Sequence, residues 1–128
     1  MSDERVAIMP TEDTLWAMEE RFWTQGADSA RTMTAKGAVF VFPYPGGILK
    51  GDDIWREDLV AQRWRSVEFS ERWFNRVADI CVLAYCVSAE REGDPIYEAY
   101  CTSSYLKDGD TWLRLLHQQT PVSNPDPS

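Results

Sequence analysis

The first apolar segment of the chain repeats with the period of an α-helix. When successive residues are placed 100° apart, its apolar side chains fall within an arc of about 160°. They are Leu15, Trp16, Met18, Phe22 and Trp23. Thr11 is a suitable N-cap, Gly26 can end the helix, and Glu19 lies near the centre of the apolar arc. The pattern therefore predicts a helix from Thr11 to about Gly26 that directs one carboxylate toward the core.

The next segment changes period and is punctuated by proline and glycine. It predicts a short helix over about 28–35, a strand over 38–42, and a turn at the PYPGG run. A few extended residues follow, and then Asp52 or Asp53 caps a third helix with the sequence IWREDLVAQRW. Its core side would carry Ile54, Trp55, Leu59 and Ala61. Asp58 falls within this apolar arc and is interpreted as a solvated residue at its edge.

After Trp64 the pattern is typical of strands as far as residue 120. Four strands are predicted, over 66–76, 77–91, 96–107 and 111–120. The EGDP and KDGD runs supply the turns between the last three. The junction near Arg76 has no turn signal, so a tight turn there follows from strand length alone. Helices followed by a long antiparallel meander indicate an α+β fold.

Two of the strand segments are apolar on both faces. The runs AVFVF and ICVLAYCV carry apolar residues at odd and even positions alike, so both faces of the sheet need cover. Two or three helices can cover only one face. The other face then needs a second copy of the chain or leaves an apolar patch, and a homodimer through the sheet is predicted. Trp73 and Trp112 are candidates for that interface.

Composition and charge narrow the function classes. The 128 residues carry 13 Lys and Arg against 21 Asp and Glu, a net charge of −8, which argues against nucleic-acid binding. No run approaches the roughly 18 apolar residues of a membrane helix, and the N-terminal residues do not form a signal peptide. We expect a cytoplasmic protein with one domain over 11–121 and disordered ends at 1–10 and 122–128.

Cysteine and histidine usage gives no metal signal. The three cysteines, Cys81, Cys86 and Cys101, form no CxxC motif and are interpreted as small buried hydrophobic residues without disulfides. Cys81 and Cys86 would point to opposite faces of one strand. With a single histidine, a zinc site has little to build on, and we predict neither a metal nor a cofactor.

Three stretches resemble one superfamily. EERFWTQGADS is similar to the first-helix segment, GAVFVFPYPGGILKGDDIW to the strand, turn and third helix, and YLKDGDTWLRLLHQQTP to the last strand of nuclear transport factor 2-like proteins of the SnoaL-like branch. The resemblance covers about residues 11–121. It implies a strongly curved antiparallel sheet wrapped around two to three N-terminal helices, an open cone-shaped pocket, and homodimers through the outer sheet face.

Aromatic residues are the candidate lining of that pocket. The chain has six Trp, five Tyr and five Phe, and many large rings converge on the predicted cone. The predicted ligand-binding residues are Trp16, Trp23, Phe40, Phe42, Trp55, Tyr85, Tyr100 and Gln119. Packing in the core is the alternative for most of these rings. As a pocket they would suit a small apolar or aromatic molecule.

Glu19 and His117 are the candidate acid–base pair. Desolvation by Trp-rich surroundings would raise the pKa of Glu19, as in general acids and bases, and His117 on the last strand is its natural partner. Alternatively, Glu19 accepts a structural hydrogen bond from a Trp or Arg, or reaches water. Gln119 lies on the same side of the strand as His117.

The residues expected of two known activities are missing. The catalytic Tyr and Asp positions implied by ketosteroid isomerase-like relatives hold apolar residues here, and the two histidines of scytalone dehydratase-like sites are reduced to His117. Three hypotheses follow: a ligand-binding protein without an assigned reaction, a cofactor-independent isomerase, cyclase or dehydratase acting on a polycyclic or polyketide-like substrate, and a non-catalytic interaction module.

Overall fold

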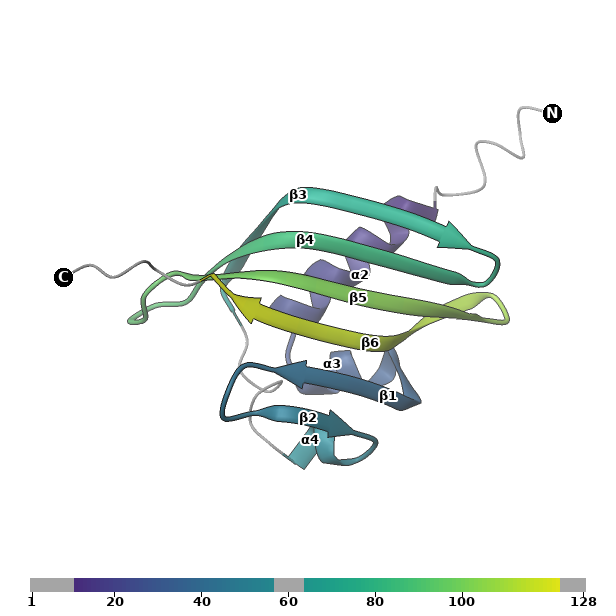
Figure 1. Ribbon diagram of the computed structural model, residues 1–128, viewed down its shortest axis with the longest axis horizontal. Helices are drawn as coiled ribbons and strands as arrows, with labels where there is room; N and C mark the ends of the chain where they lie inside the picture. Colours follow the sequence, from purple (N-terminus) through teal and green to yellow (C-terminus); the bar gives the residue numbers. More distant parts are fainter. Residues whose placement is uncertain (1–10, 57–63, 123–128) are drawn as a thin grey trace.

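The computed structural model describes residues 11–56 and 64–122 of the chain (Figure 1). Within these residues, three helices and six strands follow one another. In order they are α2 (Thr11–Thr24), α3 (Ala27–Thr32), β1 (Thr34–Phe42), β2 (Gly47–Lys50), α4 (Asp53–Arg56), β3 (Ser66–Val77), β4 (Ile80–Glu90), β5 (Tyr97–Asp108) and β6 (Thr111–Pro121). The α+β fold class predicted from the sequence is confirmed.

Most predicted elements occur close to their expected bounds. The first helix and the four long strands are confirmed, whereas the second helix ends at Thr32 because the chain is already extended from Thr34. The turn near Arg76 consists of two residues, Ala78 and Asp79, with Ala78 at a φ of 53°. A backbone hydrogen bond from β5 holds this turn in place: the Lys107 N–H donates to the Asp79 carbonyl at 2.8 Å.

Some predictions fall wholly or partly outside the described residues. Asp58, Leu59 and Ala61 of the third helix lie there, as do the two terminal segments predicted to be disordered, except for one residue. That residue is Val122, whose N–H donates to the Glu98 carbonyl at 2.9 Å. Within the described ranges, no helix is long and apolar enough to cross a membrane.

The strands form one curved, open sheet in the order β2-β1-β6-β5-β4-β3. The prediction of a purely antiparallel sheet needs one correction, because β1 pairs with β6 in the parallel direction. Figure 1 shows the sheet in front, with α2 crossing behind the long strands.

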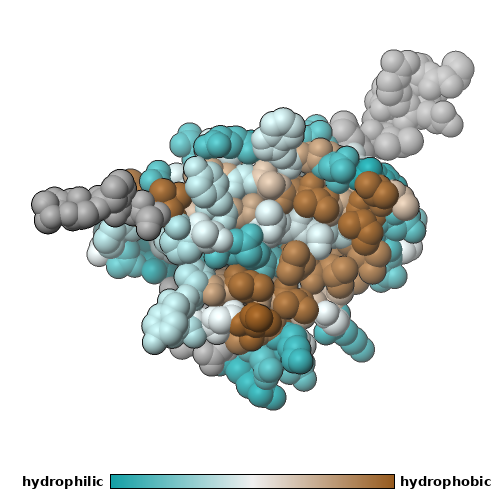
Figure 2. Space-filling model, viewed as in Figure 1, coloured by the Kyte–Doolittle hydropathy of each residue, from teal (hydrophilic) through white to brown (hydrophobic). Residues whose placement is uncertain are grey.

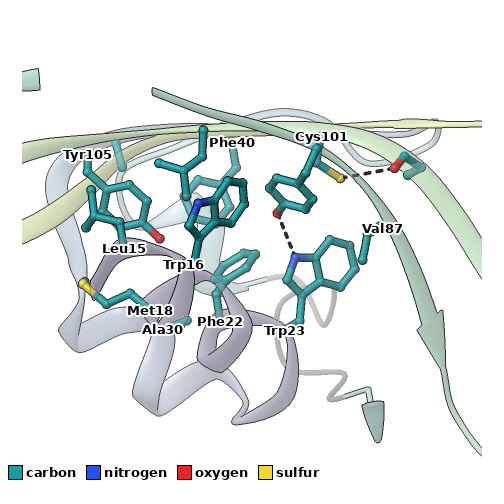
Figure 3. Packing of buried hydrophobic residues seen from close by; sticks show 14 of the residues in the cluster. Leu15, Trp16, Met18, Phe22, Trp23, Ala30, Phe40, Val87, Cys101 and Tyr105 are labelled. Carbon is teal, nitrogen blue, oxygen red and sulfur yellow. Dashed lines mark hydrogen bonds between the residues drawn. The ribbon is translucent and has the colours of Figure 1, made fainter. Parts of the chain in front are cut away.

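The core lies between α2 and the inner face of the sheet. In β4 and β5 the odd-numbered side chains point inward and are buried, from Cys81 to Ala89 and from Ala99 to Tyr105. In β1 the inward positions are even-numbered, with Phe40 and Phe42 buried. Figure 3 shows Trp16, Phe22 and Trp23 of α2 packed among residues of the sheet.

Two β-bulges interrupt the regular alternation of side chains. In β3 the register passes from Ser70↔Cys86 to Trp73↔Ala84, which leaves one extra residue in β3. In β6 it passes from Tyr105↔Arg114 to Ser104↔Leu116, which leaves Leu115 as the extra residue. An extra residue changes the parity of the positions that follow it. Arg114 and His117, three residues apart, are therefore both buried on the inner side.

The outer face of the sheet carries exposed apolar side chains. On this face lie Ile48, Trp73, Val77, Val82 and Tyr100, which are 42–76% exposed. Figure 2 views this face and shows apolar areas separated by polar ones. Two predicted placements need correction here. Trp112 packs against the core, with the Arg76 guanidinium 5.1 Å from its ring, and so does not join the outer face. Tyr100 does not face the core, because even-numbered residues of β5 point outward.

The cysteines are all free in the structure. Cys81 and Cys101 are buried, and Cys86 is half-buried because it points to the outer face, opposite to Cys81. The prediction that Cys81 and Cys86 face opposite sides of one strand is confirmed, whereas full burial of all three cysteines is wrong for Cys86.

Candidate functional site

Glu19 lies at the centre of a buried polar cluster. Its carboxylate is fully buried and accepts four hydrogen bonds. Oε2 accepts from the hydroxyls of Tyr85 and Ser103, the latter at 2.5 Å. Oε1 accepts from the Tyr105 hydroxyl at 2.5 Å and from Arg114 Nη2 at 3.1 Å. Because a carboxylate offers about four acceptor positions, the hydrogen-bonding capacity of Glu19 is filled.

Arg114 is the counter-ion of Glu19. The whole side chain is buried, its Nη2 also donates to the Tyr105 hydroxyl, and its Cζ lies 4.0 Å from the centre of the Phe22 ring. Its Nε and Nη1 atoms have no hydrogen-bond partner among the described residues. The guanidinium therefore depends on one carboxylate and on the faces of two aromatic rings, Phe22 and Tyr105, for compensation of its buried charge.

The charges in the cluster fix its protonation. Burial raises the pKa of Glu19, but the positive charge of Arg114 and hydrogen bonds to the carboxylate outweigh it, so the pKa lies well below its ordinary value. The prediction of a raised pKa is therefore wrong. Burial lowers the pKa of His117 despite the attraction of Glu19. At neutral pH the cluster holds an ionised Glu19, a charged Arg114 and a neutral His117.

His117 extends the polar cluster toward one end of the sheet. Its Nδ1 lies 2.8 Å from Ser103 Oγ, and its Nε2 lies 3.0 Å from Gln119 Nε2. Tyr97 in turn donates its hydroxyl proton to Gln119 Oε1 at 2.9 Å. The predicted placement of Gln119 on the side of His117 is confirmed. A continuous chain of hydrogen bonds thus links the buried Glu19 to Tyr97.

Tyr97 and Gln119 belong to a cavity at the mouth of the fold. This mouth pocket has a volume of about 210 Å³. It is lined by Phe42, Pro43, Tyr44, Pro45, Trp64, Tyr97 and Gln119. The rings of Trp64 and Tyr97 are stacked, with centroids 5.6 Å apart and planes inclined by 16°. The pocket therefore combines aromatic and proline walls with a polar end formed by the Gln119 amide and the Tyr97 hydroxyl.

The predicted ligand-binding residues are divided among four places. Trp16, Trp23, Phe40 and Tyr85 pack in the core and are at most 7% exposed. Phe42 and Gln119 line the mouth pocket. Trp55 borders a surface cavity beside Arg31 and Lys36. Tyr100 borders a shallow groove with Trp73 on the outer face. The rings expected to line an open cone therefore mostly contact one another.

Sequence reasoning missed several members of the site. Ser103, Tyr105 and Arg114 complete the Glu19 cluster, and Trp64 and Tyr97 complete the mouth pocket. A signal for the first group was present, because a buried carboxylate requires a buried cation and donors. No group of three or more His, Cys, Asp or Glu side chains within the described ranges is placed to hold a metal ion.

Comparisons with known proteins relate the chain by its fold. No model of a protein family matches it, and no curated protein matches it. A candidate ketosteroid isomerase from Parabacteroides distasonis is similar in structure, with a TM-score of 0.79, 11% identity, and 91% of this chain and 92% of that chain covered. A nuclear transport factor 2-like protein from Cytophaga hutchinsonii has a TM-score of 0.72, 12% identity, and coverages of 89% and 100%.

A third similar structure is a candidate calcium/calmodulin-dependent kinase II association domain from Exiguobacterium sibiricum. It has a TM-score of 0.70 and 15% identity, and the comparison covers 95% of this chain and 100% of that chain. At these identities the likeness concerns the fold. The chain has the nuclear transport factor 2-like fold, as its sequence resemblance implied.

Proposed function

We propose that the protein binds a small apolar or aromatic molecule in the mouth pocket. The observation that carries this proposal is the combination of aromatic walls with one polar end in a cavity of about 210 Å³. Binding sites for small molecules are mostly apolar with a few placed polar groups, and drug-sized ligands occupy about 300–1,000 Å³. The smaller volume here favours a flat ligand of one or two rings.

The binding role is better supported than the enzyme alternative. An isomerase, cyclase or dehydratase using Glu19 and His117 would need a base with a free lone pair that reaches the substrate. Glu19 has four donors on its carboxylate and is fully buried, and His117 is fully buried beneath Gln119. In our proposal these two residues support the pocket wall and do not contact the ligand.

Titration with quinoline, a flat bicyclic probe, tests this function. We expect the indole N–H resonance of Trp64 and the side-chain amide resonances of Gln119 to shift in 1H–15N NMR spectra. Trp64→Ala should weaken binding by about tenfold, since a stacked aromatic pair contributes about 0.5–1.5 kcal/mol beyond area burial. Trp55→Ala, which removes a tryptophan from another cavity, should leave affinity unchanged. Equal affinity of Trp64→Ala and the wild type would refute the proposal.

We also propose that two copies associate through the outer sheet face. The supporting observation is the set of exposed apolar side chains there, including Trp73 at 76% and Tyr100 at 52% exposure. Trp73 and Tyr100 border the same groove, and a contiguous exposed apolar patch is typical of a surface that another protein covers. A homodimer through this face would also agree with the hypothesis of a non-catalytic interaction module. One similar structure is a candidate association domain.

Light scattering at micromolar concentration tests the homodimer. We expect twice the monomer mass for the wild type and the monomer mass for Trp73→Glu, because a buried unpaired charge opposes association. Tyr44→Glu is the matched control, since Tyr44 is 97% exposed but lies at the mouth pocket. A monomeric wild type would refute the homodimer.

A further inference from the structure

The hydrogen bonds between Glu19 and the mouth pocket have a fixed direction. This series of hydrogen bonds begins at the Glu19 carboxylate and passes through Ser103, His117 and Gln119 to Tyr97. Each of these groups has a limited number of protons. The position of every proton can therefore be followed from the buried charge outward.

The carboxylate determines the tautomer of His117. The single hydroxyl proton of Ser103 is donated to Glu19 Oε2, because an ionised carboxylate only accepts. Ser103 Oγ can then only accept from His117 Nδ1, 2.8 Å away, and Glu19 Oε2 lies 3.5 Å from the same nitrogen. Both neighbours of Nδ1 are acceptors. Nδ1 therefore carries a proton.

The tautomer of His117 determines the orientation of Gln119. Since burial keeps the imidazole neutral, its second nitrogen, Nε2, has no proton and accepts a hydrogen bond. Gln119 must present its amide N–H₂ group to this nitrogen, at 3.0 Å. The amide oxygen then points the other way and accepts the Tyr97 hydroxyl proton at 2.9 Å.

The polar end of the mouth pocket thereby acquires one donor and one acceptor. The proton of Tyr97 is engaged by Gln119, so the Tyr97 oxygen can only accept from a ligand. The Gln119 amide has a second N–H, for which the described part of the chain provides no partner, so Gln119 can donate. Burial raises the pKa of Tyr97 to about 12, which keeps the phenol protonated at neutral pH.

We propose that the mouth pocket selects ligands in which an N–H lies next to a carbonyl, as in a flat cyclic amide. The ligand N–H would donate to Tyr97 Oη, and its carbonyl would accept from Gln119 Nε2. This inference rests on the proposed binding function and adds the chemical class of the ligand. Glu19 acts as a positioning residue here, because its charge sets the proton positions without touching the ligand.

Two isosteric probes test the selection. 2-Quinolone has a ring N–H beside its carbonyl, and coumarin has a ring oxygen at the same position. We expect 2-quinolone to bind about tenfold more tightly than coumarin. The ring oxygen of coumarin cannot donate to Tyr97 Oη, and a hydrogen-bonding group left without its partner costs about 1–3 kcal/mol, of which contact with water recovers a part. In Gln119→Leu the Tyr97 hydroxyl is free to donate or accept, so the preference should fall to within about twofold. Gln118→Leu, on the outer face, should retain the preference.

The outcomes separate this inference from the function on which it rests. Binding of 2-quinolone, coumarin and quinoline with equal affinity would overturn the selection and leave the binding function standing. Failure of all three to bind would overturn both. The nitrogen chemical shifts of His117 provide a readout without ligand. We expect a protonated Nδ1 and an unprotonated Nε2, and the opposite tautomer would overturn the inference.

Discussion

Replacing Glu19 by glutamine is expected to lower the free energy of unfolding by about 3–5 kcal/mol, because it leaves the Arg114 guanidinium buried without its counter-ion. The amide group adds a second difficulty. One carboxylate oxygen becomes an N–H₂ group that faces hydroxyl donors. A domain of this size has a total stability of about 5–15 kcal/mol, so the loss is a large fraction of it. Urea denaturation followed by tryptophan fluorescence measures the change.

Glu20→Gln is the matched control for this substitution. Glu20 is the next residue of α2 and is exposed, so the same chemical change should alter stability by less than about 0.5 kcal/mol. The pair Glu19→Leu and Arg114→Met should recover part of the loss, since apolar replacements of a buried ion pair are often tolerated. A stability of Glu19→Gln within 1 kcal/mol of wild type, on the order of an ordinary surface change, would contradict the assigned role of the ion pair.

Acid dependence provides a second arm of the same experiment. The pKa of Glu19 is lowered in the folded state, whereas the pKa of a glutamate in the unfolded chain is about 4.3. The ionised carboxylate therefore contributes its full stability above that pH, and the contribution decreases as the pH falls below it. The difference in stability between wild type and Glu19→Gln should accordingly be largest at neutral pH and shrink in acid. A difference that does not change with pH would show that the charge of Glu19 does not contribute.

The sequence was sufficient to predict the position of Glu19 but not its chemistry. Periodicity alone placed this residue inside the apolar arc of the first helix, and the structure confirms its burial. The direction of its pKa depends on which charged groups share the interior. That information comes from strands more than 80 residues away in the chain.

Arg114 was missed for a specific physical reason. In a regular strand, residues two apart share a face, so counting back from His117 places Leu115 inside and Arg114 outside. The bulge at Leu115 reverses this parity, and no glycine or proline marks it in the sequence. The bulge in β3 reverses parity in the same way, so that the half-buried Phe69 and Phe74 are five residues apart.

Sequence patterns also could not predict whether the interior of the cone is packed or hollow. Spacing placed Trp16, Trp23, Phe40 and Tyr85 inside the fold, and all four are buried, but it misplaced Tyr100, which faces outward. Whether buried rings enclose a cavity depends on how their volumes fit together. Here the Trp23 indole donates to the Tyr85 hydroxyl at 3.0 Å, and the cavity lies farther out, at Trp64 and Tyr97.

Deletion of Leu115 is expected to cost only about 1–2 kcal/mol and to leave a cooperative unfolding transition, because Arg114 and His117 then lie two positions apart in a regular strand and share the inner face. The pairs Tyr105↔Arg114 and Ser104↔Leu116 become consecutive, so the side chains of residues 116–121 keep their faces. Arg114 therefore stays beside Glu19, and the loss is that of the half-buried Leu115 side chain. Near-ultraviolet circular dichroism and urea denaturation measure whether tertiary packing is retained.

Two controls separate the bulge from the side chain and from chain length. Leu115→Ala keeps the extra residue and removes a half-buried side chain, so it should cost only about 1–2 kcal/mol. Deletion of Glu92, in the exposed connection between β4 and β5, shortens the chain without changing the parity of either strand and should leave a cooperative transition. If the chain lacking Leu115 lost its cooperative transition while Leu115→Ala kept it, regular pairing of β6 would not hold Arg114 and His117 inside. The ion pair between Glu19 and Arg114 would then depend on the bulge.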